Sequence, residues 1–116
     1  MATAVLFIGW NRPSPGHENE AYRFLMGEAI ETLDTFQKQG YCESQERVGL
    51  TAHGGDLNGF ILLFGERAKL DELRRTDAFE RFAMRLSTQF VGVGVIPGVN
   101  WAGMQKVAAR NPDLTR

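Results

Sequence analysis

The chain has 116 residues, of which 43% are hydrophobic and 23% charged, proportions typical of one globular domain and not of a disordered segment. Its 13 basic and 14 acidic residues give a net charge of −1 and are interspersed along the sequence. This pattern excludes the basic stripe of a nucleic-acid-binding protein, so no nucleic-acid partner is expected.

The cellular location is predicted from three features of the sequence. No apolar run reaches the roughly 18 residues that span a bilayer. The first residues, "MATAVLFIGWN", lack the basic region of a signal peptide. Cys42 is the only cysteine, so no disulfide can form within the chain, and this suits a reducing compartment. We therefore expect a cytoplasmic protein without a membrane partner.

The first half of the chain predicts one strand and one long helix. Residues 4–10, "AVLFIGW", form an apolar run rich in strand formers, and "NRPSPG" then interrupts regular structure. Residues 17–40 have helical periodicity and end at a glycine suited to a helix C-terminus. The residues on the apolar face of this predicted helix are Tyr22, Leu25, Ala29, Leu33 and Phe36.

The second half predicts two strands, an interrupted helix, a last strand and a short terminal helix. Alternating residues 47–53 and the apolar run 57–66 predict a hairpin that turns at "GGD". A helical pattern follows, with a break or new N-cap at Thr76–Asp77. Its apolar positions are Leu70, Leu73, Phe79, Phe82 and Leu86. Residues 91–98 predict the last strand, and "WAGMQKVAAR" predicts a helix over 101–110.

The predicted order βαββαβ is that of the ferredoxin-like α+β fold, an antiparallel sheet with both helices on one face. We assign this fold to residues 1–100, and a short C-terminal helix and tail to residues 101–116. The strands at 4–10 and 57–66 are apolar at both odd and even positions, so the second face of the sheet is also apolar. An exposed patch of that size favours association. We therefore predict a homodimer that pairs sheet to sheet.

The chain resembles the dimeric α+β barrel superfamily over about residues 4 to 100. The resemblance rests on the element order, on the two-sided strands and on "LDELRRTDAFERF", which is similar to the second helix of many small members. It implies ferredoxin-like subunits paired sheet to sheet. The superfamily includes cofactor-independent monooxygenases, isomerases, dehalogenase-like and haem-dependent enzymes, and members without a known activity, so the resemblance leaves the reaction open.

A binding pocket is predicted on one face of the hairpin, and its position depends on the length of the loop. An even loop would place Val48, Leu50, Ala52, Leu57, Ile61 and Leu63 toward the helices. The opposite face would then carry Arg47, Thr51, His53, Asn58, Phe60, Leu62 and Phe64. An apolar floor with polar groups at one edge is typical of a small-molecule site. An odd loop would undo this assignment.

Five residues are candidates for chemistry or for contacts near the pocket. His53 is the candidate general base, against the alternative of a solvated hairpin end. Arg47 could anchor a carboxylate or pair with a nearby glutamate, and with Asn11 it could orient an oxyanion. Trp10 and Trp101 are expected either in the pocket wall or in the contact between subunits.

No metal or cofactor is predicted. His17 and His53 lie far apart without the HxH or HxxxH spacing of metal ligands, and His17 is expected to cap a helix or face solvent. A haem ligand remains open, because a single histidine suffices for that role. The sequence has no nucleophile elbow or phosphate loop.

The sequence leaves two functions open. The first is a cofactor-independent oxygenase or isomerase acting on a small aromatic or polyketide-like molecule. The second is a non-catalytic small-molecule-binding or assembly module. The absence of a converging acid–base pair in the sequence favours the second.

Overall fold

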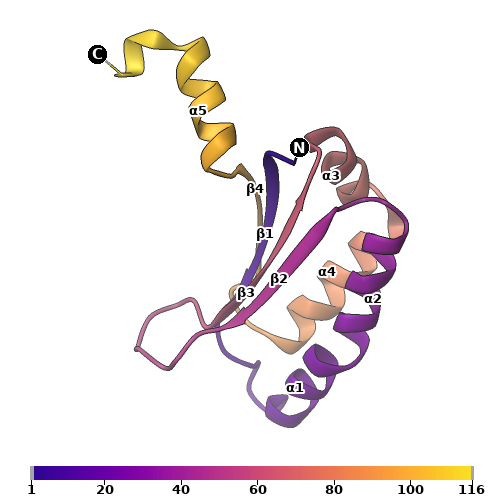
Figure 1. The fold of residues 1–116 in the computed structure, drawn as a ribbon. Helices are drawn as coiled ribbons and strands as arrows, with labels where there is room; N and C mark the ends of the chain where they lie inside the picture. The colour runs from indigo at the N-terminus through magenta and orange to yellow at the C-terminus, as the bar shows by residue number, and fades with distance from the viewer. Residues whose placement is uncertain (1, 116) are drawn as a thin grey trace.

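One four-stranded antiparallel sheet organises the protein, whose computed structural model describes residues 2–115. The strands are β1 (Ala4–Trp10), β2 (Ser44–Gly49), β3 (Gly59–Gly65) and β4 (Gly94–Val99), and they lie in the order β2-β3-β1-β4. Helices α1 to α4 lie on one side of the sheet (Figure 1). This arrangement confirms the predicted ferredoxin-like α+β fold.

The hydrophobic core lies between the sheet and these helices. Leu6 and Ile8 of β1 point toward the helices, and in the register of β1 with β3 they pair with Leu63 and Ile61. All four side chains are buried. Alternate positions of the two central strands therefore supply the floor of the core, as the period of two in a strand requires.

The first helical segment is two helices, so the prediction of one continuous helix is wrong. Helix α1 (Glu18–Met26) ends at Gly27, and α2 (Glu28–Lys38) begins directly after it. Gly27 has φ −122° and ψ −89°, outside the helical region. Glycine is a weak helix former, and the break occurs there. The buried positions are Ala21 and Phe24 in α1 and Ala29, Leu33 and Phe36 in α2, so the core-facing spacing shifts at the break. Tyr22, expected on the apolar face, is 53% exposed.

The second helical segment is interrupted where the sequence predicts. Helix α3 (Arg67–Arg74) is followed by α4 (Asp77–Gln89). Thr76 caps α4, because its Oγ1 accepts a hydrogen bond from the backbone N–H of Phe79 at 3.1 Å. The N-cap prediction at Thr76–Asp77 is thus confirmed.

The ends of the last three strands differ from the prediction. Strand β2 ends at Gly49 instead of residue 53, because the chain leaves the sheet in an exposed loop over residues 50–58. Strand β4 begins at Gly94 instead of residue 91. Gly92 has φ +66°, a left-handed conformation that interrupts a strand. Strand β3 lies within the predicted residues 57–66.

Helix α5 (Trp101–Arg110) matches the predicted terminal helix and is followed by a 3-10 turn, η1 (Pro112–Thr115). Figure 1 shows α5 extending away from the layer of α1 to α4, beyond the end of β4. Its first turn is anchored by Asn100, whose Oδ1 accepts from Gly103 N at 2.9 Å and whose Nδ2 donates to Ala2 O at 3.1 Å.

The second face of the sheet carries apolar side chains and no helix from α1 to α4. We call it the open face, and its large apolar residues are Val5, Phe7, Val48, Phe60, Leu62, Phe64 and Ile96. The rings of Phe7 and Phe60 stack with their centroids 5.5 Å apart. Ile96 is 57% exposed, and the others are only partly buried. The two central strands are therefore two-sided, as the sequence indicates.

Candidate functional site

A cavity of about 280 Å³ lies between the first two helices and the β2 edge of the sheet. Its walls come from the inner faces of α1 and α2 and from β1, β2 and β3. The lining residues are Trp10, Leu25, Met26, Ala29, Ile30, Leu33, Arg47, Val48, Gly49 and Ile61. Apart from Arg47, every lining residue is apolar or a glycine. We refer to this cavity as the α2–β2 pocket.

The register of the hairpin places Arg47 in this pocket and corrects the expected face assignment. Val48 pairs with Phe60 and Arg47 pairs with Ile61. The nine residues 50–58 between the paired glycines form an odd loop, so the condition of an even loop is not met. Arg47 therefore shares the helix-facing side with Ile61, and Val48 shares the open face with Phe60.

Trp10 forms the inner wall of the pocket and is held there by two neighbours. Its side chain is 5% exposed. A Cβ placed on Gly59 would lie 2.5 Å from Cζ2 of the indole, so the ring occupies the space above that glycine. Phe90 contacts the indole with ring centroids 5.6 Å apart. The missing side chain at Gly59 thus determines where the indole lies.

Arg47 lies at the mouth of the pocket in a small polar network. Its Nη1 is 3.7 Å from Oδ1 of Asp34 on α2, and both side chains are about half exposed. Asp34 Oδ1 also accepts a hydrogen bond from Gln45 Nε2 at 3.1 Å. Gln45 Nε2 donates further to Gln37 Oε1 at 2.9 Å. Asp34 thus has two partners from β2, and Gln45 is the closer one.

Asn11 and Asn58 form a pair beside the pocket, although neither belongs to its lining. Asn58 Nδ2 donates to Asn11 Oδ1 at 2.6 Å. The backbone N–H of Asn58 donates to the carbonyl of Trp10 at 2.8 Å. This pair therefore ties the end of the 50–58 loop to the end of β1.

The other predicted site residues lie apart from the α2–β2 pocket. Thr51 and His53 are exposed on the 50–58 loop, where His53 Nδ1 lies 2.9 Å from the carbonyl oxygen of Thr51. Trp101 is 72% exposed on α5. Phe60, Leu62 and Phe64 belong to the open face. Of the predicted residues, the structure thus brings together Trp10 with Arg47, and Asn11 with Asn58.

The sequence analysis missed the helical wall of the pocket and the partner of Arg47. Leu25 and Leu33 fit the apolar face of a core helix, and nothing in their spacing distinguishes a pocket wall from core packing. Asp34 is separated from Arg47 by a turn and part of a strand. One sequence carries no signal for that contact, because it depends on how α2 lies over β2.

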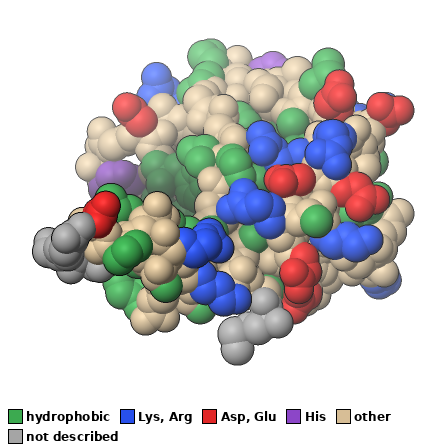
Figure 2. All heavy atoms as spheres, turned by 90° about the horizontal axis from the view of Figure 1, so that it is seen from above, with side chains coloured by type: hydrophobic (Ala, Val, Ile, Leu, Met, Phe, Trp, Pro, Cys, Tyr) green, Lys and Arg blue, Asp and Glu red, His purple; other side chains and the backbone are tan. Residues whose placement is uncertain are grey.

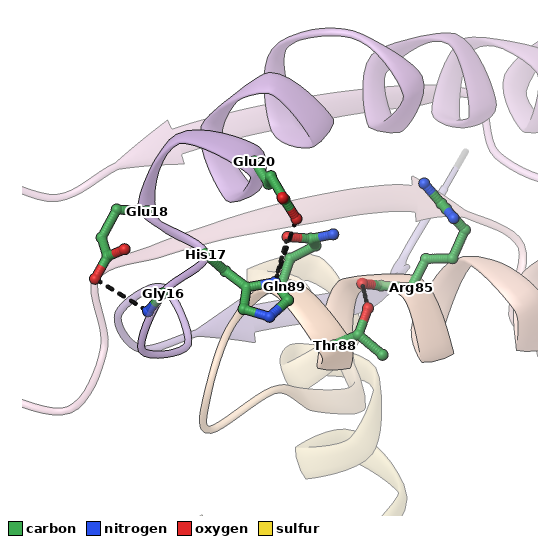
Figure 3. A network of polar contacts seen from close by, with 7 residues as sticks. All are labelled: Gly16, His17, Glu18, Glu20, Arg85, Thr88 and Gln89. Carbon is green, nitrogen blue, oxygen red and sulfur yellow. Dashed lines mark hydrogen bonds and ion pairs between the residues drawn. The ribbon is translucent and has the colours of Figure 1, made fainter.

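His17 joins two helices away from the pocket. Its Nδ1 lies 3.2 Å from Gln89 Oε1 at the end of α4 and 3.6 Å from Glu20 Oε2 in α1 (Figure 3). In the same turn, Gly16 N donates to Glu18 Oε1 at 3.3 Å. The His17 side chain makes no capping hydrogen bond to α1. These contacts describe a junction between α1 and α4.

Metal ligands and a reactive thiol are two further kinds of functional group. Within residues 2–115, no three His, Cys, Asp or Glu side chains are grouped as metal ligands would be. Cys42 is buried and free. Burial raises the pKa of the Cys42 thiol, so the group is a weaker nucleophile near neutral pH than an exposed cysteine.

The surface shows no concentration of one charge on the face seen in Figure 2. Acidic and basic side chains are interspersed there, with apolar side chains between them. None of the helices in the described part of the chain combines the length and apolar character that crossing a bilayer requires.

Comparison with known proteins shows the fold and leaves the activity open. No protein-family model matches the chain. No curated protein matches it either. Among solved structures, a dimeric ferredoxin-like protein of unknown function from Bacteroides fragilis has a TM-score of 0.60 and 10% identity, over 84% of this chain and 96% of that one.

Two other solved structures agree with this result. A dimeric ferredoxin-like protein of unknown function from Jannaschia sp. CCS1 has a TM-score of 0.61 and 15% identity, over 82% of this chain and 97% of that one. A protein of unknown function from Nitrosomonas europaea has a TM-score of 0.60 and 14% identity, with coverages of 87% and 91%. These likenesses show the fold: two of the three neighbours are described as dimeric and ferredoxin-like, and the third as a protein of unknown function.

Proposed function

We propose that the protein is a homodimeric small-molecule-binding protein that holds one apolar ligand in the α2–β2 pocket of each subunit. The observation that carries this proposal is the pocket itself, a cavity of about 280 Å³ whose walls are apolar except for Arg47. Small-molecule sites are typically concave and apolar, with a few polar groups that fix the orientation of the ligand. Trp10 adds a large aromatic surface to this wall.

The open face supports the homodimer. Its large side chains, among them Phe7, Phe60 and Ile96, are not covered by helices α1 to α4. A second copy would cover this face with an identical one about a two-fold axis. The dimeric descriptions of the Bacteroides and Jannaschia proteins support a dimer. Trp101, exposed on α5 beyond the end of β4, is a further proposed contact with the partner.

Dimerisation and ligand binding would use opposite sides of the sheet. The pocket lies on the side of α1 and α2, whereas the paired surface is the open face, and Val48 on the edge strand β2 belongs to both. The mouth of each pocket, at the β2 edge, would therefore stay uncovered in the dimer. The buried free Cys42 also fits the cytoplasmic location predicted from the sequence.

Native mass spectrometry of freshly purified protein tests both parts of the proposal. We expect the mass of a dimer that carries a co-purified small molecule. A monomer at micromolar concentration would contradict the dimer. Gly49→Leu tests the pocket, because Gly49 lines it and a Cβ there would meet no atom within 4 Å. This variant should lose the ligand and stay dimeric, whereas Thr51→Leu on the exposed loop should retain both ligand and dimer.

Catalysis by a cofactor-independent oxygenase or isomerase mechanism is the second candidate. It is favoured by the position of Arg47 beside apolar walls, where a cation stabilises a developing oxyanion effectively. The substrate would be a small aromatic or polyketide-like molecule, with Asn11 as an orienting group. His53, which lies apart from the pocket on the exposed 50–58 loop, would serve as the base only where this loop brings it to the mouth. Turnover without added cofactor that falls about 100-fold or more in His53→Ala would support it. Binding without turnover would leave the binding protein as the function.

A further inference from the structure

The polar side chains on the wall of the α2–β2 pocket are hydrogen-bond donors. Arg47 offers a guanidinium group and Trp10 an indole N–H, and neither side chain can accept a hydrogen bond. None of the other lining side chains contains nitrogen or oxygen, since they are aliphatic residues, Met26 and Gly49. A ligand that complements this wall combines an apolar body with an acceptor group.

We infer that the ligand is a small apolar carboxylate whose anionic group pairs with Arg47. The inference rests on the proposed function and adds the chemical class of the ligand. Guanidinium matches a carboxylate with two parallel hydrogen bonds, and the apolar wall strengthens the charge attraction. Asp34 lies beside the mouth, but no acidic side chain lines the pocket, so along the wall a cationic ligand would meet the like charge of Arg47.

A carboxylate ligand can replace Asp34 as the partner of Arg47. The Arg47–Asp34 ion pair is long, at 3.7 Å, and both groups are about half exposed to solvent. Exposed ion pairs of this kind contribute little to stability. Asp34 keeps its hydrogen bond from Gln45 at 3.1 Å when Arg47 turns toward a ligand. Asp34 therefore competes with the ligand for Arg47. Its own position does not depend on the Arg47–Asp34 ion pair, because Gln45 also binds it.

The position of Arg47 also orients the ligand. The Arg47 side chain is about half exposed and lies at the mouth of the pocket, whereas Trp10 and Ile61 are buried and lie at its inner end. The apolar body would enter first, and the carboxylate would remain near the mouth. The cavity volume is close to the lower limit of about 300 Å³ for small-molecule sites, which suits a body with one ring.

Three matched probes test the inference: phenylacetate, phenylacetamide and phenethylamine, each titrated into the dimer by calorimetry or NMR. We expect phenylacetate to bind about 10-fold or more tightly than the amide, and the amine to bind most weakly. Arg47→Gln should reduce phenylacetate affinity to that of the amide. Asp34→Asn should tighten phenylacetate several-fold and leave the amide unchanged. Arg12→Gln, which changes an exposed arginine outside the pocket wall, is the matched control.

The outcomes separate this inference from the proposed function. If the amide binds in the pocket as tightly as phenylacetate, or if Arg47→Gln leaves phenylacetate binding unchanged, the carboxylate inference is overturned while the pocket stands. Gly49→Leu identifies binding in the pocket, because it should abolish binding of both probes. If none of the three probes binds at millimolar concentration, the carboxylate inference is overturned, while the co-purified ligand and the Gly49→Leu variant in native mass spectrometry decide the pocket proposal. Asp34→Asn preserves the cation, so its effect is informative even if Arg47→Gln impairs folding.

Discussion

The indole ring of Trp10 occupies the space that a side chain at Gly59 would fill. The two residues are direct partners in the register of β1 with β3, and a Cβ on Gly59 would lie 2.5 Å from Cζ2 and 2.9 Å from Nε1 of the indole. The ring is nearly buried and is backed by Phe90. Gly59 in β3 therefore determines the position of Trp10, the aromatic wall of the α2–β2 pocket.

Gly59→Ala should displace the indole and damage both the fold and the site. The added methyl group meets a rigid buried ring, so we expect a loss of about 1–3 kcal/mol in the free energy of unfolding, measured with urea. Ligand affinity should fall as well, because the pocket wall moves. The control for stability is Gly49→Ala, at the position paired with Gly59 in β2, where a Cβ meets no atom within 4 Å. Equal stability of the two variants would contradict this role of Gly59.

Phe7→Glu should separate the dimer into folded monomers. Phe7 belongs to the open face, where its ring stacks on Phe60, whereas its neighbours Leu6 and Ile8 fill the core. A charge there costs little in the free subunit and is unfavourable in a paired apolar surface. Sedimentation should give a monomer with a native circular dichroism spectrum.

Two further substitutions are the controls for the Phe7→Glu experiment. Tyr22→Glu changes a 53% exposed residue of α1 and should leave the dimer intact. Leu6→Glu places the charge in the core and should unfold the subunit. A Phe7→Glu protein that remains dimeric at micromolar concentration would exclude the open face as the interface.

Sequence periodicity predicted the fold well because β1 and β3 are apolar on both faces, which is the pattern of central strands in a sheet. Residues 4–10 form β1 with the predicted ends, and the two-sided pattern of β1 and β3 is explained by a sheet with helices on one face. The break between α1 and α2 was missed because Tyr22 and Leu25 extend the apolar spacing of α2 back past Gly27, whereas the structure buries Ala21 and Phe24. A shift of one residue is hidden in a sequence where an apolar residue stands beside each buried one.

The pocket was harder to predict because its position depends on the parity of one loop. The polar face expected around Arg47 was placed on the wrong side of the sheet, since a change of one residue in loop length exchanges the two faces of a strand. Trp10 and Arg47 were identified as candidates, yet their shared cavity depends on how α2 lies over β2. His53 was the best single candidate for a base, but the sequence favoured a solvated hairpin end, and the residue lies exposed on this nine-residue loop.

Thr76→Ala should destabilise the protein through loss of a helix cap. The Thr76 hydroxyl accepts a hydrogen bond from Phe79 N, and without it this N–H at the start of α4 loses its side-chain partner. We expect a loss of about 1 kcal/mol in the free energy of unfolding. Thr88→Ala is the matched control, because Thr88 is exposed near the end of α4 and its hydroxyl bonds only the carbonyl of Arg85 (Figure 3). Similar losses in the two variants would show that the cap contributes nothing specific.

Cys42 should react slowly with iodoacetamide in the folded protein and should make the fold less stable in alkali. Its side chain is buried, and burial raises the pKa of the thiol. In the unfolded chain the thiol ionises near pH 8.5. The unfolded state therefore releases the proton at lower pH than the folded state, so the free energy of unfolding falls as pH rises above that value.

Alkylation measured from pH 7 to 10, with urea-unfolded protein as the reference, tests the Cys42 prediction. The folded rate should be the lower one throughout and should still rise with pH after the unfolded rate has levelled. In Cys42→Ala the alkaline loss of stability should become smaller, because the ionising group is absent. Equal alkylation rates in folded and unfolded protein at pH 8 would mean that the thiol is accessible and ionises normally, contrary to its position beneath the end of β3, where a Cβ on Gly65 would lie 3.3 Å from Cα of Cys42.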